Sequence, residues 1–139
     1  YNIPINEIEN IKNGADFKPE EGRVIPNEEL ITIIKRPHSY AFCSDTTFVA
    51  GNAKKIKGVT LLYHEATFMQ DLAEKAMQTG HSTTINAATV AKKAIVKKLV
   101  IGHFSTRYKS LGDLLSEAKS VFKNTELATD GITFDFDTV

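Results

Sequence analysis

The chain of 139 residues is long enough for one folded domain with a buried core. Its 17 basic and 17 acidic side chains give a formal net charge of zero, which excludes a global electrostatic attraction to nucleic acid or membrane. A single cysteine, Cys43, excludes an internal disulfide and fits a reducing compartment, so we expect a cytoplasmic protein. No apolar run approaches the roughly 20 residues that span a bilayer, so we expect no membrane partner.

The first segment, residues 1–38, is rich in Asn, Glu, Pro and Gly, and its apolar residues are sparse. This composition predicts loop with short extended pieces at 23–25 and 30–35. We expect this loop-rich segment to lead into a sheet formed by residues 39–139.

From residue 39 onward, short apolar runs alternate with amphipathic segments. Strands are predicted over 40–43, 59–63, 98–101 and 132–136, and helices over 71–78, 83–95 and 111–122. Continuous apolar strands that alternate with helices are typical of an α/β fold in which helices cover the sheet.

The charges are unevenly distributed along the chain. No acidic residue occurs between His81 and Gly112, a stretch that contains Lys92, Lys93, Lys97, Lys98, Arg107 and Lys109. Two interpretations remain open: a solvated helix face, or a local patch that binds phosphates.

Polar residues follow the predicted strands. Asp45, His64 with Glu65, and His103 each come after an apolar run, and His81 lies in a loop before a helix. In α/β sheets, chemistry gathers where strands end and loops begin. Asp and His together suit zinc or manganese, and an imidazole with a carboxylate also works as an acid–base pair. One histidine after a strand is usually an ordinary loop residue, but three similar placements favour a site.

A hydrolytic zinc site needs at least three protein ligands and an open position. The chain offers one plausible Asp and one to three His, with no H-x-H or H-E-x-x-H cluster. Either this is not a metal site, or the missing ligands come from outside this chain.

A series of short motifs carries a family resemblance. The motifs are CSDT (43–46), HEATF (64–68), GHST (80–83), HFSTRY (103–108) and the Ala128–Asp130 AxD. In order and spacing they resemble ribonuclease Z, the tRNA 3′-processing endonuclease family of the metallo-β-lactamase superfamily. The signature H-x-H-x-D-H cluster of the family's N-terminal half is absent, so the chain resembles the C-terminal portion. The resemblance implies the C-terminal half of an αββα sandwich, with a mixed sheet and covering helices.

The resemblance also implies roles for single residues. Asp45 would bridge two zinc ions, with manganese as a possible substitute, and His103 would bind one of them. Glu65 would orient His81, which would stabilise the cleaved phosphate or protonate the leaving 3′ oxygen. His64 is a further catalytic candidate, which would shape the same loop.

Other implications concern RNA and partners. Arg107 and Lys109 would hold RNA phosphates, the substrate would be precursor tRNA, and the family forms homodimers. Because the two-metal mechanism needs ligands that this chain lacks, we expect the chain alone to be inactive or nearly so. The alternatives are a non-catalytic tRNA-binding or dimerisation fragment, and another phosphodiesterase of the metallo-β-lactamase fold.

Overall fold

The computed structural model describes residues 1–31 and 37–136. The chain divides into two compact units, Tyr1–Pro37 and His38–Val139, and each is considered by itself. Most of the extended piece predicted at 30–35 lies outside the described residues. None of the helices in the described part is long and apolar enough to cross a bilayer.

The N-terminal unit contains more helix than the sequence suggested. Helix α1 (Ile5–Lys12) and the short α2 (Asn27–Leu30) replace much of the predicted loop. The loop prediction was wrong at α1. It was based on the polar composition of the segment, whereas the isoleucines of α1 recur at helical spacing. Phe17 and Ile25 form an isolated antiparallel bridge and pack with Ile11 into a small core.

The second unit is built on a four-stranded sheet. Its strands are β1 (Tyr40–Cys43), β2 (Leu61–Glu65), β3 (Lys98–Gly102) and β4 (Thr125–Leu127), arranged in chain order. The α/β prediction is confirmed. Every pairing between these strands is parallel, where a mixed sheet was predicted.

The fourth strand is not the one predicted. The alternating run at 132–136 forms no strand, and Ile132 is 55% exposed. The place beside β3 is taken by β4, which follows directly after helix α6 (Gly112–Val121). Ala128 extends the pairing by donating its backbone N–H to Ile101 O at 2.7 Å. The position beside β3 is thus occupied by the segment that directly follows α6 in the sequence.

Helices connect the strands. They are α3 (Asn52–Lys55), the 3₁₀ turn η1 (Gln70–Leu72), α4 (Ala73–Gln78), α5 (Thr84–Ala94) and α6, and those predicted from the sequence are confirmed. Helix α5 begins at Thr83, whose side chain accepts from Asn86 N while the Asn86 side chain accepts from Thr83 N. This capping box fixes where the loop before α5 ends.

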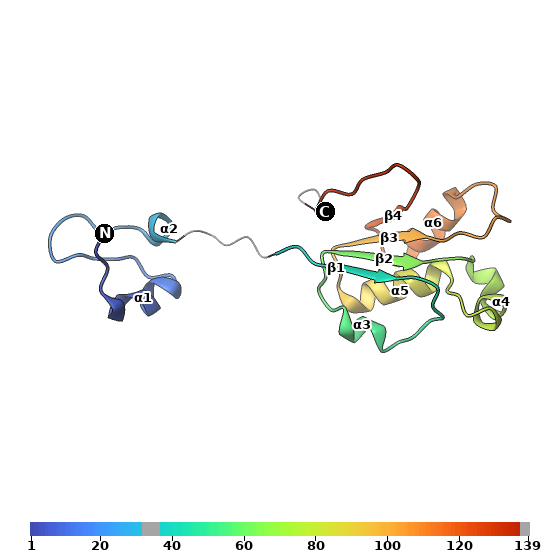
Figure 1. The fold of residues 1–139 in the computed structure, drawn as a ribbon, viewed down its shortest axis with the longest axis horizontal. Helices are drawn as coiled ribbons and strands as arrows, with labels where there is room; N and C mark the ends of the chain where they lie inside the picture. Colours follow the sequence, from blue (N-terminus) through green and yellow to red (C-terminus); the bar gives the residue numbers. More distant parts are fainter. Residues whose placement is uncertain (32–36, 137–139) are drawn as a thin grey trace. The chain divides into compact units, whose positions relative to one another are not determined.

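The main core lies between the sheet and the helices. The alanines of α5 are fully buried and pack with Leu62, Leu99 and Ile101 of the central strands. Figure 1 shows α3 and α5 along the same face of the sheet. On β1 the pattern alternates, so Tyr40 and Phe42 point away from this core and are 53% and 62% exposed. The other sheet face therefore carries exposed aromatic side chains.

Candidate metal centre

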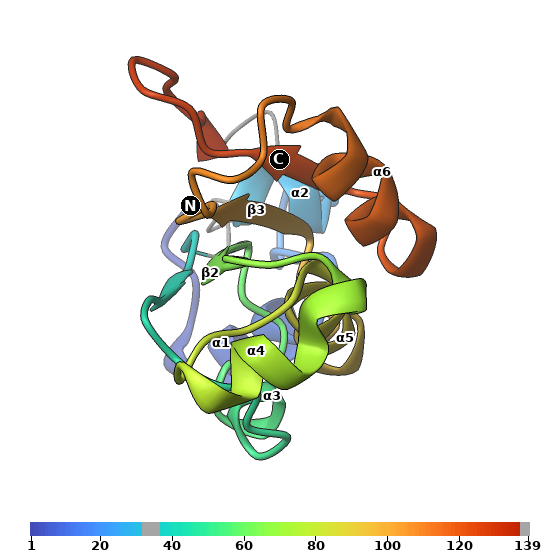
Figure 2. The same cartoon turned by 90° about the vertical axis from the view of Figure 1, so that its right-hand side faces the viewer.

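The site residues lie at the carboxyl ends of three adjacent parallel strands. The strands are aligned so that Cys43 pairs with His64, His64 with Ile101, and Glu65 with Gly102. Asp45 follows the end of β1 and His103 follows the end of β3. Parallel pairing therefore brings their loops to one edge. In Figure 2 this end of the sheet faces the viewer, with α4 in front.

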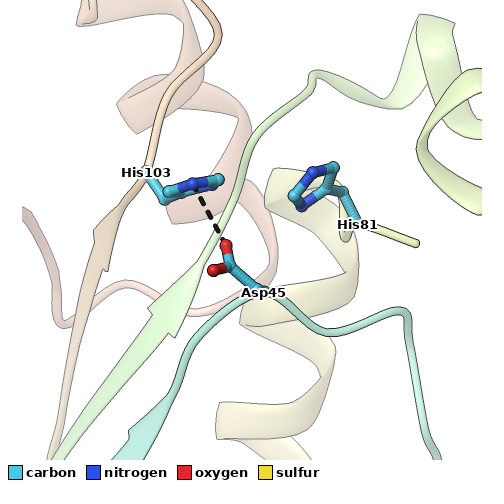
Figure 3. Close-up of side chains that lie close together, drawn as sticks. All are labelled: Asp45, His81 and His103. Atoms are coloured by element: carbon cyan, nitrogen blue, oxygen red, sulfur yellow. Dashed lines mark ion pairs between the residues drawn. The ribbon is translucent and has the colours of Figure 1, made fainter. Parts of the chain in front are cut away.

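Asp45, His81 and His103 converge at this edge. Each offers one possible ligand atom, and these three atoms lie within 4.8 Å of one another. His103 Nε2 is 3.1 Å from Asp45 Oδ1, and the His81 and His103 rings are 5.2 Å apart between centroids. Figure 3 shows the three side chains pointing toward one another from separate segments. The structure thus assembles residues that are up to 58 positions apart in the sequence.

Two of these residues have unusual backbone conformations. Asp45 has φ 47° and His103 has φ 62°, both in the left-handed region. This region is uncommon for non-glycine residues, and Asp and His adopt it more often than most others. Such conformations persist where the surroundings enforce them, and they cluster at functional sites. The positive φ values at both strand ends agree with a functional site there.

The Glu65 carboxylate lies at the centre of the hydrogen-bond network of the site. It is fully buried yet accepts five hydrogen bonds. Oε1 accepts from His81 Nδ1 at 3.1 Å, Ser82 N at 2.8 Å and Thr46 N at 3.2 Å. Oε2 accepts from Thr67 N at 3.0 Å and Thr67 Oγ1 at 2.8 Å. One carboxylate therefore ties together the loops that follow β1 and β2 and the loop that precedes α5.

Thr67 connects Glu65 to His103. Since the Thr67 hydroxyl donates to Glu65 Oε2, its oxygen is left to accept from His103 Nδ1, 2.9 Å away. The proton of a neutral His103 ring is then on Nδ1, and the Nε2 lone pair faces Asp45. A lone pair that faces a carboxylate oxygen calls for a cation or a proton between them. Thr67 was not predicted as a site residue, although its position two residues after Glu65 places it on the same side of the chain.

His81 is fixed in the same way. A carboxylate can only accept, so His81 Nδ1 carries the hydrogen toward Glu65 and Nε2 is the free nitrogen. The ring is about one quarter exposed, so solvent and substrate can reach it. The predicted pair of Glu65 and His81 is thus present as a contact, and the free nitrogen could either bind a cation or transfer a proton.

His64 does not belong to this cluster. Side chains alternate along a strand, so His64 points to the sheet face opposite to that of its neighbour Glu65. It is 1% exposed, and its Nδ1–H donates to Glu65 O at 2.7 Å. Burial lowers the pKa of His64, and the hydrogen bond to the carbonyl opposes this only in part. Any contribution of His64 to the site would pass through the shape of the backbone at Glu65.

The lowered pKa of His64 predicts a loss of stability in acid. The unfolded chain binds a proton near the ordinary histidine pKa of about 6.5, whereas the folded chain resists it. The contribution is therefore fully present above pH 6.5 and is lost as the pH falls toward the folded pKa, with a slope of up to about 1.4 kcal/mol per pH unit. Urea unfolding between pH 7.5 and 5 should show a shallower slope for His64→Gln than for the unchanged chain. Equal slopes would contradict the prediction.

Arg107 stands beside the cluster. Its guanidinium lies 5.1 Å from the centroid of the Phe68 ring, and its Nε donates to Ser105 Oγ at 3.0 Å. Phe68 in turn meets the His81 ring edge-on at 6.3 Å. This packing holds an exposed positive charge near His81. Lys109 is exposed and follows two positions later.

The donor set fits a metal ion. Two imidazoles and one carboxylate are nitrogen and oxygen donors that suit zinc and also manganese. His103 Nε2 and Asp45 face one another in the orientation that Thr67 imposes. A histidine ligand whose other nitrogen is hydrogen-bonded in this way is typical of metal sites in proteins.

The sequence is similar to curated ribonuclease Z proteins. One from Porphyromonas gingivalis is 47% identical over 135 residues, which cover 97% of this chain and 44% of the relative. One from Bacteroides thetaiotaomicron is 46% identical over 132 residues, which cover 95% of this chain and 42% of the relative. The chain is related to the C-terminal portion of ribonuclease Z. It spans less than half the length of these relatives, and no family model matches it.

Solved structures agree on the fold. A crystal structure of human tRNase Z, short form, has 34% sequence identity to this chain and a TM-score of 0.50. The match covers 68% of this chain and 30% of the human chain. A metallo-β-lactamase fold protein from Bacillus subtilis has a TM-score of 0.64 and 24% sequence identity to this chain. The match covers 68% of this chain and 39% of the Bacillus subtilis chain, and it supports the fold alone. The resemblance to ribonuclease Z and the fold class, the C-terminal half of a metallo-β-lactamase sandwich, are confirmed.

Proposed function

We propose that this chain forms part of an endoribonuclease that removes the 3′ trailer of precursor tRNA by zinc-dependent phosphodiester hydrolysis. The observation that carries the proposal is the Glu65 network, which fixes His81 directly and His103 through Thr67. The similarity to ribonuclease Z proteins and to human tRNase Z supports the class of substrate.

Asp45 and His103 would hold the zinc ion, with manganese as the alternative. A bound ion would supply Lewis acidity to the phosphate. With its Nδ1 hydrogen held by Glu65, His81 would act as an acid after binding a second proton on Nε2, and it would pass that Nε2 proton to the leaving 3′ oxygen. Glu65 itself is buried and acts by keeping His81 in this orientation.

The RNA would be held by charge beside the cluster. The Arg107 guanidinium, fixed over Phe68, keeps its terminal nitrogens available for a phosphate, and Lys109 would add a second positive charge. His64 would contribute only by shaping the backbone that carries Glu65.

The working enzyme would contain further polypeptide. A two-zinc site needs more ligands than Asp45, His81 and His103 provide. The relatives are more than twice as long as the part that this chain matches, and the sheet face that carries Tyr40 and Phe42 is exposed. We propose that the complete enzyme is a cytoplasmic homodimer and that this chain alone is nearly inactive.

The test is cleavage of precursor tRNA by the chain with and without the missing portion. Alone with zinc or manganese, the chain should release almost no trailer. Co-expressed with the N-terminal portion of the Porphyromonas gingivalis relative, it should release the 3′ trailer. His81→Ala should then lower the rate by roughly 10²–10⁴-fold, because the leaving oxygen loses its proton donor.

Lys119→Ala, an exposed change on α6, is the matched control and should leave the rate unchanged. Robust cleavage by the chain alone would contradict its inactivity. A well-folded complex that binds zinc but releases no trailer would contradict the function, and a dimeric mass with tRNA binding would then favour a non-catalytic module.

A further inference from the structure

A second group of positive charges lies far from the metal centre. Two segments about 40 positions apart meet where α3 packs against the end of α5, and Gly58 N donates to Ala94 O at 2.7 Å between them. Both segments carry exposed lysines there. We call these six residues the lysine surface: Lys54, Lys55, Lys57, Lys92, Lys93 and Lys97. Three of them, Lys54, Lys57 and Lys93, help to line a hollow of about 450 Å³.

The lysine surface forms no ion pairs within the described residues. No acidic residue occurs in 46–64 or in 75–112, and none of the six lysines is in an ion pair among the described residues. Lys98, close by in sequence, is different because it pairs with Glu126 at 2.8 Å. The dipoles of α3 and α5 favour lysines in their last turns, but Lys57 and Lys97 lie outside both helices. Exposed positive charges that form no ion pairs with acidic side chains favour an anionic partner.

Ile95 lines the same hollow as these lysines. It ends α5 with φ 55°, in the left-handed region, and its side chain is 66% exposed beside the lysine-lined hollow. A β-branched residue is strongly disfavoured in this conformation, where glycine is usual. Neither burial nor backbone preference explains an isoleucine here. An apolar contact with a bound ligand would.

The lysine surface and the metal centre lie at opposite ends of α5. The helix begins at the loop that carries His81 and ends at Ile95, so its 11 residues separate the two by about 16 Å. Figure 1 shows α3 at the end of the sheet away from α4. Arg107 and Lys109 follow β3 at the metal-centre end and do not belong to the lysine surface.

We propose that the lysine surface is a second RNA-binding site, which holds backbone phosphates of the substrate away from the bond that is cleaved. The proposal rests on the proposed function, because a folded RNA large enough to extend past α5 is the anion that this chain would meet. Six exposed ammonium groups on flexible stems suit repeated phosphates rather than one bound ion. A membrane surface is less suited, because Ile95 is the one large exposed apolar side chain lining the hollow, and interfacial binding needs an apolar face.

The test is RNA binding by the 139-residue chain in EDTA, so that the metal centre and cleavage play no part. The triple variant Lys54→Gln, Lys57→Gln, Lys93→Gln is compared with Lys18→Gln, Lys119→Gln, Lys123→Gln, which removes the same charge from other exposed positions. Filter binding of a mature tRNA is measured between about 50 and 200 mM NaCl. Each lost phosphate contact should lower the slope of log K against log salt by roughly 0.7–0.9. The first triple should thus flatten the slope by about 2 and weaken binding about tenfold or more, and the control triple should change neither.

Equal effects of the two triples would overturn the proposal, as would a chain that binds no tRNA at any salt concentration. Binding to vesicles containing phosphatidylserine that the first triple abolishes, with tRNA binding unchanged, would assign the lysine surface to membranes and also overturn it. A chain that binds tRNA through these lysines but releases no trailer when complemented would leave the proposal standing and contradict the proposed catalytic function. The two failures are therefore distinguishable.

Discussion

Glu65→Gln is expected to destabilise the second unit by about 2–4 kcal/mol, the largest effect of any single substitution at the site. The buried carboxylate accepts from five donors in three loops, and a glutamine amide offers only one accepting oxygen. Its NH₂ group would face backbone N–H groups that are also donors. Donors left unpaired in a buried position cost about 1–3 kcal/mol each, which sets the size of the effect.

Urea unfolding followed by circular dichroism measures this loss. The matched control is Glu126→Gln, since Glu126 is also a glutamate in a charge-assisted contact but is 48% exposed. Its pair with Lys98 is a partly exposed ion pair, so the control should lose no more than about 1 kcal/mol. Similar losses for the two variants would mean that the network around Glu65 contributes nothing beyond an ordinary surface contact.

The fold was predictable where the apolar pattern of a single segment is enough to identify it as a strand or a helix. Strands β2 and β3 are continuous apolar runs, and α5 and α6 have apolar stripes at helical spacing. Strand β4 is only Thr125–Leu127, and its pairing with β3 depends on where α6 delivers the chain. The run at 132–136 has a better alternating pattern and still forms no strand. Local pattern fails here because the strand beside β3 is set by the short segment that follows α6 in the sequence.

The site was predictable to a similar extent. Asp45 and His103 follow from the rule that functional loops leave the carboxyl ends of parallel strands. His81 lies in a loop between two helices, and the structure brings all three side chains together. The backbone N–H groups of Thr46 and Ser82 could not be predicted, because a backbone donor is the same in every sequence. The burial of the other histidine was predictable.

His64 lies two positions after Leu62, so the alternation of side chains along β2 is enough to assign it to the core face. The pair His64-Glu65 therefore splits, with one residue on each face of the sheet. A sequence motif groups adjacent residues together, whereas a β-strand points their side chains to opposite faces of the sheet. The motif residue that does share the site is Thr67, through its contacts with Glu65 and His103.

Thr67→Val is expected to weaken zinc binding by the chain about 10–100-fold, the range found when a hydrogen bond to a histidine ligand is removed. Valine keeps the shape of threonine but cannot accept the hydrogen from His103 Nδ1, so Nε2 is no longer held toward Asp45 as a lone pair. Thr67→Ser retains the hydroxyl and should restore the affinity. His103→Ala and Asp45→Ala remove donors outright and should reduce it further.

Zinc titration with a competing chelator measures all of these variants, and His38→Ala, which removes a histidine outside the cluster, is the control. His81→Ala separates the two roles open to that ring. Unchanged affinity means that its Nε2 is reserved for proton transfer, and a loss as large as that of His103→Ala means that it is a ligand. If Thr67→Val and Thr67→Ser bind zinc equally well, the hydroxyl does not orient His103. The packing of the loop alone would then place this histidine beside Asp45.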